Sequence, residues 1–278
     1  MSEAWDRAAA GWNAQAPLIR DWLREPTRLM LEAAQVTLGA RVIDVAAGAG
    51  DQTLDIAQRV GPRGQVLAID SSAAILRLAA DRARQAGHGH VKVLVADAQR
   101  LQLDGAGFDA AVCRLGLMFC ATPLDALQGI RAALRPGGCF SGLVFAAPEH
   151  NPCLCLQVAV ARRHAGMKPA SHDELCRPGG LMSVGSPTLL SSLLQSAGFA
   201  DVALRPIDAP VLLPSVDHYV EFLKTAASPI IELLAPLTEA ERQAAWHDMR
   251  RQLDAYTTST GWVGPKALLL FSAQVPCG

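Results

Sequence analysis

Between residues 40 and 147 the hydrophobic positions fall into short apolar runs, many of them β-branched, which alternate with longer amphipathic segments. Such runs are typical of strands covered on both faces, and the amphipathic segments between them are typical of helices. The predicted strands are Arg41–Ala46, Gln65–Asp70, Val91–Ala96, Phe108–Arg114 and Cys139–Ala146. The predicted helices are Gln52–Val60, Ser72–Ala86 and Leu124–Leu134, the last stopped by Pro136-Gly137-Gly138. This alternation predicts a parallel sheet with right-handed crossovers.

The segments on either side follow other patterns. Residues 1–39 interleave large apolar side chains with charges, which predicts helices that end at Gly39. Residues 148–185 are rich in Pro, Gly, His and Cys with weak periodicity, and predict a cap of loops and helices. The elements predicted after this cap are a helix Pro187–Ala197, a sixth strand Asp201–Leu213, a helical insertion over residues 216–257 and a seventh strand Ala267–Val275.

These elements together predict an α/β protein with a doubly wound, seven-stranded sheet, N-terminal helices and a helical cap or insertion. We expect the N-terminal helices in residues 1–39 and a ligand-binding core in residues 40–147. Residues 148–278 are expected to form the cap and to complete the same sheet.

Composition narrows the class of protein. Half of the 278 residues are hydrophobic and no apolar run approaches the roughly 20 residues needed to cross a bilayer. Glu3 and Asp6 lie where a secretory signal would carry only positive charge, so we expect a cytoplasmic globular protein without a membrane span. The net charge is −1 with no basic block, which argues against nucleic acid as a partner. The seven Cys are an odd number, and several lie in apolar stretches, which favours reduced thiols.

A glycine-rich turn follows the first predicted strand, in Val42-Ile43-Asp44-Val45-Ala46-Ala47-Gly48-Ala49-Gly50, and a helix begins directly after it. Gly48 and Gly50 remove side chains, so a ligand can lie against the backbone, and glycine tolerates the positive φ that such turns need. The helix presents unpaired N–H groups that would hold a carboxylate or a phosphate. The turn alone does not distinguish these two ligands from simple tight packing.

Two acids at the ends of the next two predicted strands narrow the kind of ligand that the turn would bind. Asp70 ends the second strand, 20 residues after Gly50, which is the position of an acid that accepts hydrogen bonds from ribose hydroxyls. Asp97 follows the third strand, where it can accept from an adenine amine. Either acid could instead cap the helix or turn that follows it. Because carboxyl ends of parallel strands share one edge of the sheet, the turn and both acids predict an adenosine site.

The ordered set Asp44-x-Ala46-x-Gly48-x-Gly50, Asp70, Asp97-Ala98 and Leu134-Arg135-Pro136-Gly137-Gly138 resembles the class I S-adenosylmethionine-dependent methyltransferases, which have a Rossmann-like fold. The resemblance spans about residues 40–147 and is nearest to the branch of the ubiquinone/menaquinone C-methyltransferases. It implies S-adenosylmethionine as the cofactor, with its methionine end at the glycine turn. The cofactor-binding residues that it implies are Trp12, Asp44, Ala46, Gly48, Gly50, Gln52, Asp70, Ser71, Asp97, Ala98, Gln99 and Arg114.

The chain also departs from that family in two places. Ala46 stands where the family often has Gly, and residues 216–257 interrupt the last pair of strands. The resemblance further implies that the segment from Leu115 to Phe119 lines the route to the methyl group. Trp12 would lie over the cofactor, or else pack in the core of an amphipathic helix.

The expected acceptor is a small hydrophobic or aromatic molecule, methylated on carbon or oxygen, because the predicted cap is rich in Leu, Val and Met. A phenol, enol or carbon acid needs a base to take its proton. The candidates in the cap are His150, His164, His172 and His218, each of which could equally be a solvated surface residue. We expect no metal site, because Cys153-x-Cys155 lacks the paired spacing of a zinc knuckle.

Three other functions stay open at this stage. An NAD(P)-dependent oxidoreductase would need Gly-x-Gly-x-x-Gly, but the third glycine position is Thr53. The chain could also be a non-catalytic regulatory protein that keeps the cofactor fold. A methyltransferase of protein or RNA is disfavoured by the missing basic patch. The acceptor, the atom methylated, the base and the oligomeric state, with a homodimer among the options, are not determined by these patterns.

Overall fold

The order of the strands in the larger sheet decides where a site can lie. The computed structural model describes residues 11, 13–103, 105 and 107–277. Seven strands pair in the order β3-β2-β1-β4-β5-β10-β6, which confirms the predicted seven-stranded α/β sheet. Their bounds are β1 Arg41–Val45, β2 Gln65–Asp70, β3 Val91–Val95, β4 Phe108–Arg114, β5 Leu134–Phe145, β6 Ala200–Asp208 and β10 Ala267–Gln274. The first five are parallel, and β10 runs antiparallel to both of its neighbours.

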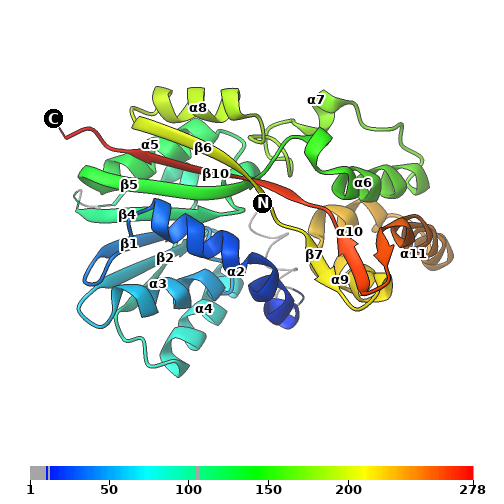
Figure 1. Cartoon of the computed structure of the whole chain (residues 1–278), viewed down its shortest axis with the longest axis horizontal. Helices are drawn as coiled ribbons and strands as arrows, with labels where there is room; N and C mark the ends of the chain where they lie inside the picture. The colour runs from blue at the N-terminus through cyan, green and yellow to red at the C-terminus, as the bar shows by residue number, and fades with distance from the viewer. Residues whose placement is uncertain (1–10, 12, 104, 106, 278) are drawn as a thin grey trace.

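Helices cover both faces of this sheet. From β1 the chain moves outward through β2 to β3, and then returns to β4 on the other side of β1. Right-handed crossovers therefore place α3 (Asp51–Val60) and α4 (Ala73–Gln85) on one face and α5 (Pro123–Ala133) on the other. The helix α2 (Ala16–Ala33) contacts α3, and α8 (Pro187–Ser196) contacts α5, which completes the two layers (Figure 1). Ligands of such sheets bind between the strands where the order reverses, here β1 and β4.

The remaining elements lie beside the sheet, and we call them the cap (Figure 1). The cap contains α6 Pro152–His164, α7 His172–Leu175, α9 Val216–Ala226, α10 Ser228–Leu234, α11 Glu239–Leu253 and the three strands β7 Val211–Leu213, β8 Thr257–Thr258 and β9 Gly261–Gly264. These three strands form a second, antiparallel sheet in the order β7-β9-β8. Among the described residues, no helix is long and apolar enough to cross a membrane.

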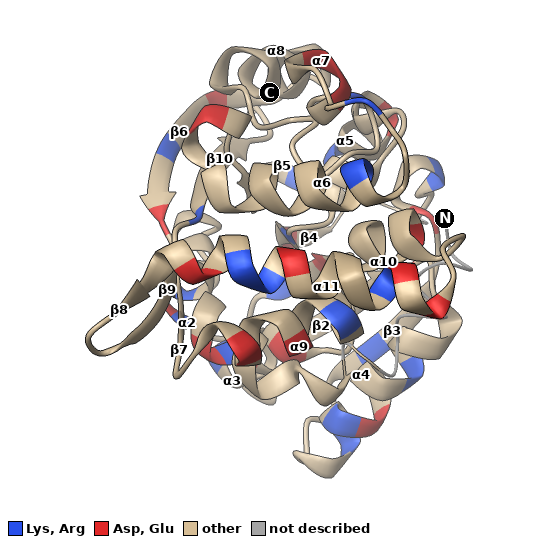
Figure 2. Ribbon diagram, turned by 90° about the vertical axis from the view of Figure 1, so that its right-hand side faces the viewer, with Lys and Arg blue, Asp and Glu red and all other residues tan. Residues whose placement is uncertain are grey.

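The two largest buried apolar clusters hold the molecule together. One joins the seven-stranded sheet to its helices, and the other fills the cap around Tyr219 and Trp262, whose rings stack at 4.1 Å. Trp22 and Phe222 pack against both clusters. Opposite the cap interior, α11 turns both signs of charge toward solvent (Figure 2).

Two predicted elements differ from the structure. The predicted sixth strand, Asp201–Leu213, divides into β6 and β7, which belong to different sheets. Pro210 lies at this division, and a proline cannot donate to a ladder. The predicted stop at residues 136–138 is instead part of β5, which starts at Leu134 and pairs with β4 through a register shift.

The weak periodicity of residues 148–185 also has a physical cause. The helix α6 buries Leu154 against the sheet cluster, and Cys153, Val160 and Ala161 against the cap cluster. A helix covered on two sides has no single apolar stripe, so its pattern carries little helical signal.

Candidate functional site

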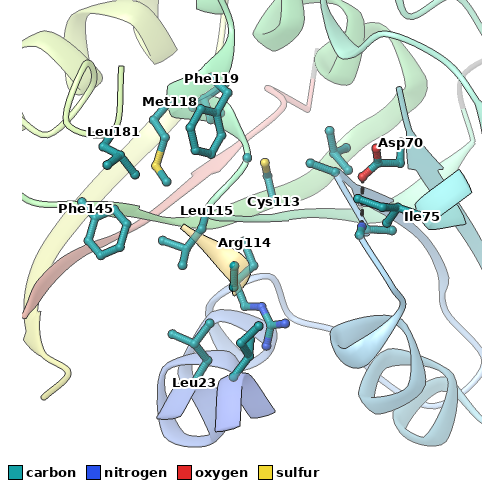
Figure 3. Close-up of a pocket in the computed structure, with 18 of the residues that line it drawn as sticks. Leu23, Asp70, Ile75, Cys113, Arg114, Leu115, Met118, Phe119, Phe145 and Leu181 are labelled. Atoms are coloured by element: carbon teal, nitrogen blue, oxygen red, sulfur yellow. Dashed lines mark hydrogen bonds between the residues drawn. The ribbon is translucent and has the colours of Figure 1, made fainter. Parts of the chain in front are cut away.

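A cavity opens at the carboxyl ends of β1, β2 and β4 and extends under the cap. Its volume of about 230 Å³ far exceeds the roughly 15 Å³ that one water molecule requires. In Figure 3, Asp70 and Ile75 lie at one end, Phe145 and Leu181 at the other, and Arg114 and Leu115 between them. The crevice expected between the strand ends is therefore open and has two ends.

The glycine turn forms the floor of the first end. Gly48 has a φ of +57° and Gly50 a φ of +89°, so both occupy the left-handed region that favours glycine. A Cβ at Gly50 would lie 2.8 Å from Ala79 Cα, because α3 and α4 pack closely there. A Cβ at Gly48 would meet nothing within 4 Å, since this residue faces the open cavity. The two glycines thus serve different purposes, one for packing and one for access.

Asp70 lies directly against this turn. The backbone N–H of Gly48 donates to Asp70 Oδ2 at 3.0 Å, and that of Ser72 donates to Asp70 Oδ1 at 2.9 Å. Asp70 and its neighbour Ser71 both line the cavity. The carboxylate therefore contacts the loop into α4 and the glycine turn at once, and so joins the ends of two adjacent strands.

Asp44 supports the turn from below. It is fully buried and accepts hydrogen bonds from Gln52 Nε2 and, at 2.6 Å, from Thr53 Oγ1. Burial raises the pKa of Asp44 to about 6, and the two donors oppose that rise. Gln52 lines the cavity, whereas Asp44 does not. Asp44 is therefore placed to fix the first turn of α3 rather than to touch a ligand.

Arg114 ends β4 inside the cavity wall. Its Nη1 donates to Thr27 Oγ1 at 2.9 Å, which ties the strand to α2. Burial lowers the pKa of Arg114, while the nearby carboxylates of Asp51, Asp44 and Asp55 raise it. This cation therefore has acidic neighbours.

Asp97 lies at the third strand end. It accepts from the backbone N–H of Gln99 at 3.0 Å and so caps the short 3₁₀ turn Ala98–Arg100. Gln99 Oε1 in turn accepts from the N–H of Thr122 at 2.8 Å. Asp97, Ala98 and Gln99 all line the cavity.

The structure brings most of the predicted cofactor residues to one cavity. Those that line it are Ala46, Gly48, Gln52, Asp70, Ser71, Asp97, Ala98, Gln99 and Arg114. Gly50 and Asp44 lie behind the lining, and Trp12 lies outside the described residues. Ala46 adopts a φ of +54°, in the left-handed region that favours glycine.

The four histidine candidates lie away from this cavity. His164 Nε2 contacts Asp248 Oδ2 at 3.0 Å, and His218 Nδ1 contacts Ser215 Oγ at 2.9 Å. His150 and His172 are exposed, the latter 3.7 Å from a Glu149 oxygen. None of the four side chains lines the cavity; His150, His172 and His218 are exposed, and His164 is turned toward Asp248 of α11.

The second end of the cavity is apolar except for a cluster of three polar side chains that the sequence analysis did not predict. Its lining includes Trp22, Leu23, Phe145, Leu154, Val158, Leu181 and Phe222. Among these apolar side chains lie Gln157 of α6, Tyr219 of α9 and Lys266, which directly precedes β10. One signal was available: Lys266 is the only charged residue between Gly261 and Val275.

Comparisons with known proteins agree with this geometry. Residues 42–138 match the family model described as a methyltransferase domain. The chain is 36% identical over 153 residues to the ubiquinone/menaquinone biosynthesis C-methyltransferase UbiE of Pseudomonas savastanoi pv. phaseolicola. That match covers 54% of this chain and 60% of the relative, so the chain spans less than two thirds of that protein.

Solved structures share the fold at low sequence identity. The YcgJ protein of Bacillus subtilis is 17% identical with a TM-score of 0.62, and the match covers 92% of this chain and all of that one. A phosphoethanolamine N-methyltransferase of Haemonchus contortus, solved in complex with S-adenosyl-L-methionine, is 16% identical with a TM-score of 0.57. That match covers 91% of this chain and 52% of the Haemonchus protein.

Proposed function

We propose that this chain transfers a methyl group from S-adenosylmethionine to a small apolar acceptor, because its residues 42–138 match a methyltransferase-domain family model and its relatives include a C-methyltransferase. The observation that carries the proposal is the hydrogen bond from Gly48 N–H to Asp70, both at one cavity. This hydrogen bond places the glycine turn, which is suited to bind a carboxylate, next to Asp70, which is suited to bind a ribose.

The first end of the cavity fits the cofactor. The N-terminus of α3 and the bare backbone at Gly48 would hold the methionine carboxylate. Asp70 would accept from the ribose hydroxyls, and Asp97 with the backbone after it would face the adenine. Asp44 would act through Gln52 and Thr53 by keeping the turn in shape.

The second end fits the acceptor. When bound, the cofactor supplies a methyl group already activated by its sulfonium. The protein then has to align the acceptor with that methyl group and exclude water. The apolar walls from α2, α6 and α9 would do both. The name of the UbiE relative supports an aromatic acceptor methylated on carbon, and oxygen is the alternative site.

This proposal divides the chain by task. Residues 40–147 would bind the cofactor, and residues 148–278 would form the acceptor wall while completing the sheet. Residues 1–39 would close the cavity through Trp22 and Leu23.

Calorimetry with S-adenosylhomocysteine tests the cofactor half. Wild-type protein should bind it, and Asp70→Ala should weaken binding by about 10- to 100-fold, since a hydrogen bond to a charged group contributes about 1.5–3 kcal/mol. Asp81→Ala removes an exposed acid of α4 and should change nothing. Binding of NAD(P) in place of S-adenosylhomocysteine would refute the proposal.

Transfer itself needs a separate measurement. Protein with methyl-labelled S-adenosylmethionine should label some member of a panel of quinones, phenols and aromatic acids. Tight cofactor binding without labelling of any of them would favour a regulatory protein that keeps the fold.

A further inference from the structure

A lysine is buried at the acceptor end of the cavity. Lys266 is 5% exposed and its Nζ donates to Tyr219 Oη at 2.8 Å. The same hydroxyl accepts from Gln157 Nε2 at 2.6 Å. The side chains of Lys266, Tyr219 and Gln157 all line the cavity and are almost fully buried.

The backbone around this lysine is held firmly. Its carbonyl accepts from the N–H of Ala209 at 2.8 Å. The next N–H, of Ala267, donates to Asn151 Oδ1 at 3.0 Å, and Asn151 Nδ2 donates to the carbonyls of Ala146 and Ala267. Asn151 is fully buried. Hydrogen bonds that involve Ala209, Asn151 and Ala146 therefore fix where the lysine side chain starts, so its ammonium has a defined place in the cavity wall.

Lys266 has no acidic partner among the described residues. The other charged side chains of the cavity wall are Asp51, Asp70, Asp97 and Arg114, which come from the sheet side. Arg114 has acidic neighbours, whereas no carboxylate of the described residues contributes to the pKa of Lys266. Two of its three N–H groups have no acceptor among the described residues.

A buried ammonium without a counter-charge is costly, because burial removes its hydration. The sulfonium of the proposed cofactor is positive as well, so it cannot supply the missing charge. The cost of burying the ammonium falls if the molecule that enters the second end of the cavity carries a negative charge. The surrounding walls are apolar and aromatic, so the rest of that molecule should be apolar.

We propose that Lys266 and Tyr219 form a recognition site for a negatively charged oxygen on an otherwise apolar acceptor, with Gln157 as the residue that positions Tyr219. This inference rests on the proposed function and narrows its acceptor to aromatic or apolar acids, phenols and enols. Lys266 holds the oxygen as an anion and turns the acceptor toward the cofactor end of the cavity.

The protonation states agree with this role. Burial lowers the pKa of Lys266 to about 8, so the side chain is still mostly a cation at neutral pH. Burial raises the pKa of Tyr219 and of Cys153, so both groups that face the lysine stay neutral. The site therefore carries a net positive charge before the acceptor enters.

The test compares ligands of one shape and different charge. Naphthoate, naphthol and the methyl ester of naphthoate are titrated by calorimetry into protein saturated with S-adenosylhomocysteine. Wild type should bind naphthoate or naphthol about 10- to 100-fold tighter than the ester, as expected of a hydrogen bond to a charged group. Preference for naphthoate identifies carboxylates as the acceptor class. Preference for naphthol, with release of a proton on binding, identifies acidic hydroxyls.

Variants locate the effect. Lys266→Met should abolish the preference while affinity for the ester and for S-adenosylhomocysteine stays within about twofold. Tyr219→Phe should reduce the preference, and Lys224→Met, an exposed lysine on the same helix as Tyr219, should leave it intact. If Lys266→Met fails to fold, the test rests on two results: the preference of wild type for the acids over the ester, and its reduction in Tyr219→Phe.

Two results would overturn the inference: a wild type that does not distinguish the acids from the ester, or a preference that survives Lys266→Met. Failure of the proposed function looks different. In that case S-adenosylhomocysteine does not bind at all. Titration of the same three ligands without it still measures whether the site prefers the acids to the ester.

Discussion

Gly50 shows how much one residue can matter in the glycine turn after β1. Its φ of +89° strains any other side chain, and an added Cβ would also press on Ala79. Gly87 has a φ of +75° but open space around it, so it isolates the first effect from the second.

We expect Gly50→Ala to lower the free energy of unfolding by about 2–4 kcal/mol, since left-handed strain and overpacking add. Gly87→Ala should cost only about 1–2 kcal/mol from strain. Urea denaturation measures both. Equal losses would mean that the close approach of α3 to α4 does not matter.

Lys266 is a second residue with a measurable cost. The shift of its pKa from 10.5 to about 8 corresponds to roughly 3 kcal/mol of disfavoured charge burial. Lys266→Met should therefore be more stable than wild type at pH 7, by up to about 3 kcal/mol. A residue that costs stability in this way is typical of a functional site.

The pH dependence provides a check. Between pH 8 and 10.5 the unfolded chain binds more protons at Lys266 than the native chain does, so wild-type stability rises with pH across that window. The advantage of Lys266→Met should shrink by pH 10, whereas Lys224→Met should match wild type throughout. A Lys266→Met variant less stable than wild type at pH 7 would contradict this account.

At the scale of elements, the contact between α6 and α11 closes the cap on its outer side. Asp248 on α11 contacts Arg163 and His164 of α6, and also Arg251 and Gln252 of its own helix. These donors hold the pKa of Asp248 well below its usual range. The contribution of this carboxylate is therefore complete above its ordinary value of 3.8 and is lost as the pH falls below it.

Replacing Asp248 by Asn should loosen this contact. We expect a loss of up to about 1 kcal/mol, because the partners are partly exposed. Hydrogen exchange should become faster in α6 and α11 and stay unchanged in β1 and β4. Glu239→Gln, which removes a pair within α11 alone, is the control. Faster exchange across the whole sheet would show that the cap and the sheet open together.

At the scale of the whole molecule, the cavity lies where the two apolar clusters meet. Trp22 stacks on Phe145 with centroids 6.3 Å apart, and its indole N–H donates to the carbonyl of Ala209 at 2.7 Å. One side chain of α2 thus touches both the sheet and the segment that leads into the cap. A ligand in the cavity contacts elements of both clusters, so it should stabilise them together.

S-adenosylhomocysteine at 100 times its Kd should add about 2.7 kcal/mol and raise Tm by roughly 5–10 °C in one transition. Differential scanning calorimetry measures the shift, and Asp70→Ala at the same ligand concentration should show far less. Two transitions, of which only one moves, would mean that the cap folds independently of the cofactor site.

The part of the cavity that we propose binds the cofactor was predictable from short segments. Each strand, its turn and the following helix are contiguous, and right-handed crossovers bring successive strand ends to one edge. Gly48, Asp70 and Asp97 therefore line one cavity although they lie more than 20 residues apart along the chain. The role of Asp44 was not predictable in this way, because only the packing of α3 shows that it lies behind the turn.

The sequence by itself determined the alternation of strands and helices in residues 40–147 and the sheet edge that we propose binds the cofactor, because those depend on local pattern and on the fixed hand of the crossovers. Only the tertiary structure decided the end of the cavity that we propose binds the acceptor. Trp22, Phe145, Gln157, Tyr219 and Lys266 are far apart along the chain and share no periodic pattern. What makes the lysine notable is its burial without an acid beside it, and burial is a property of what packs around a residue rather than of its neighbours in sequence.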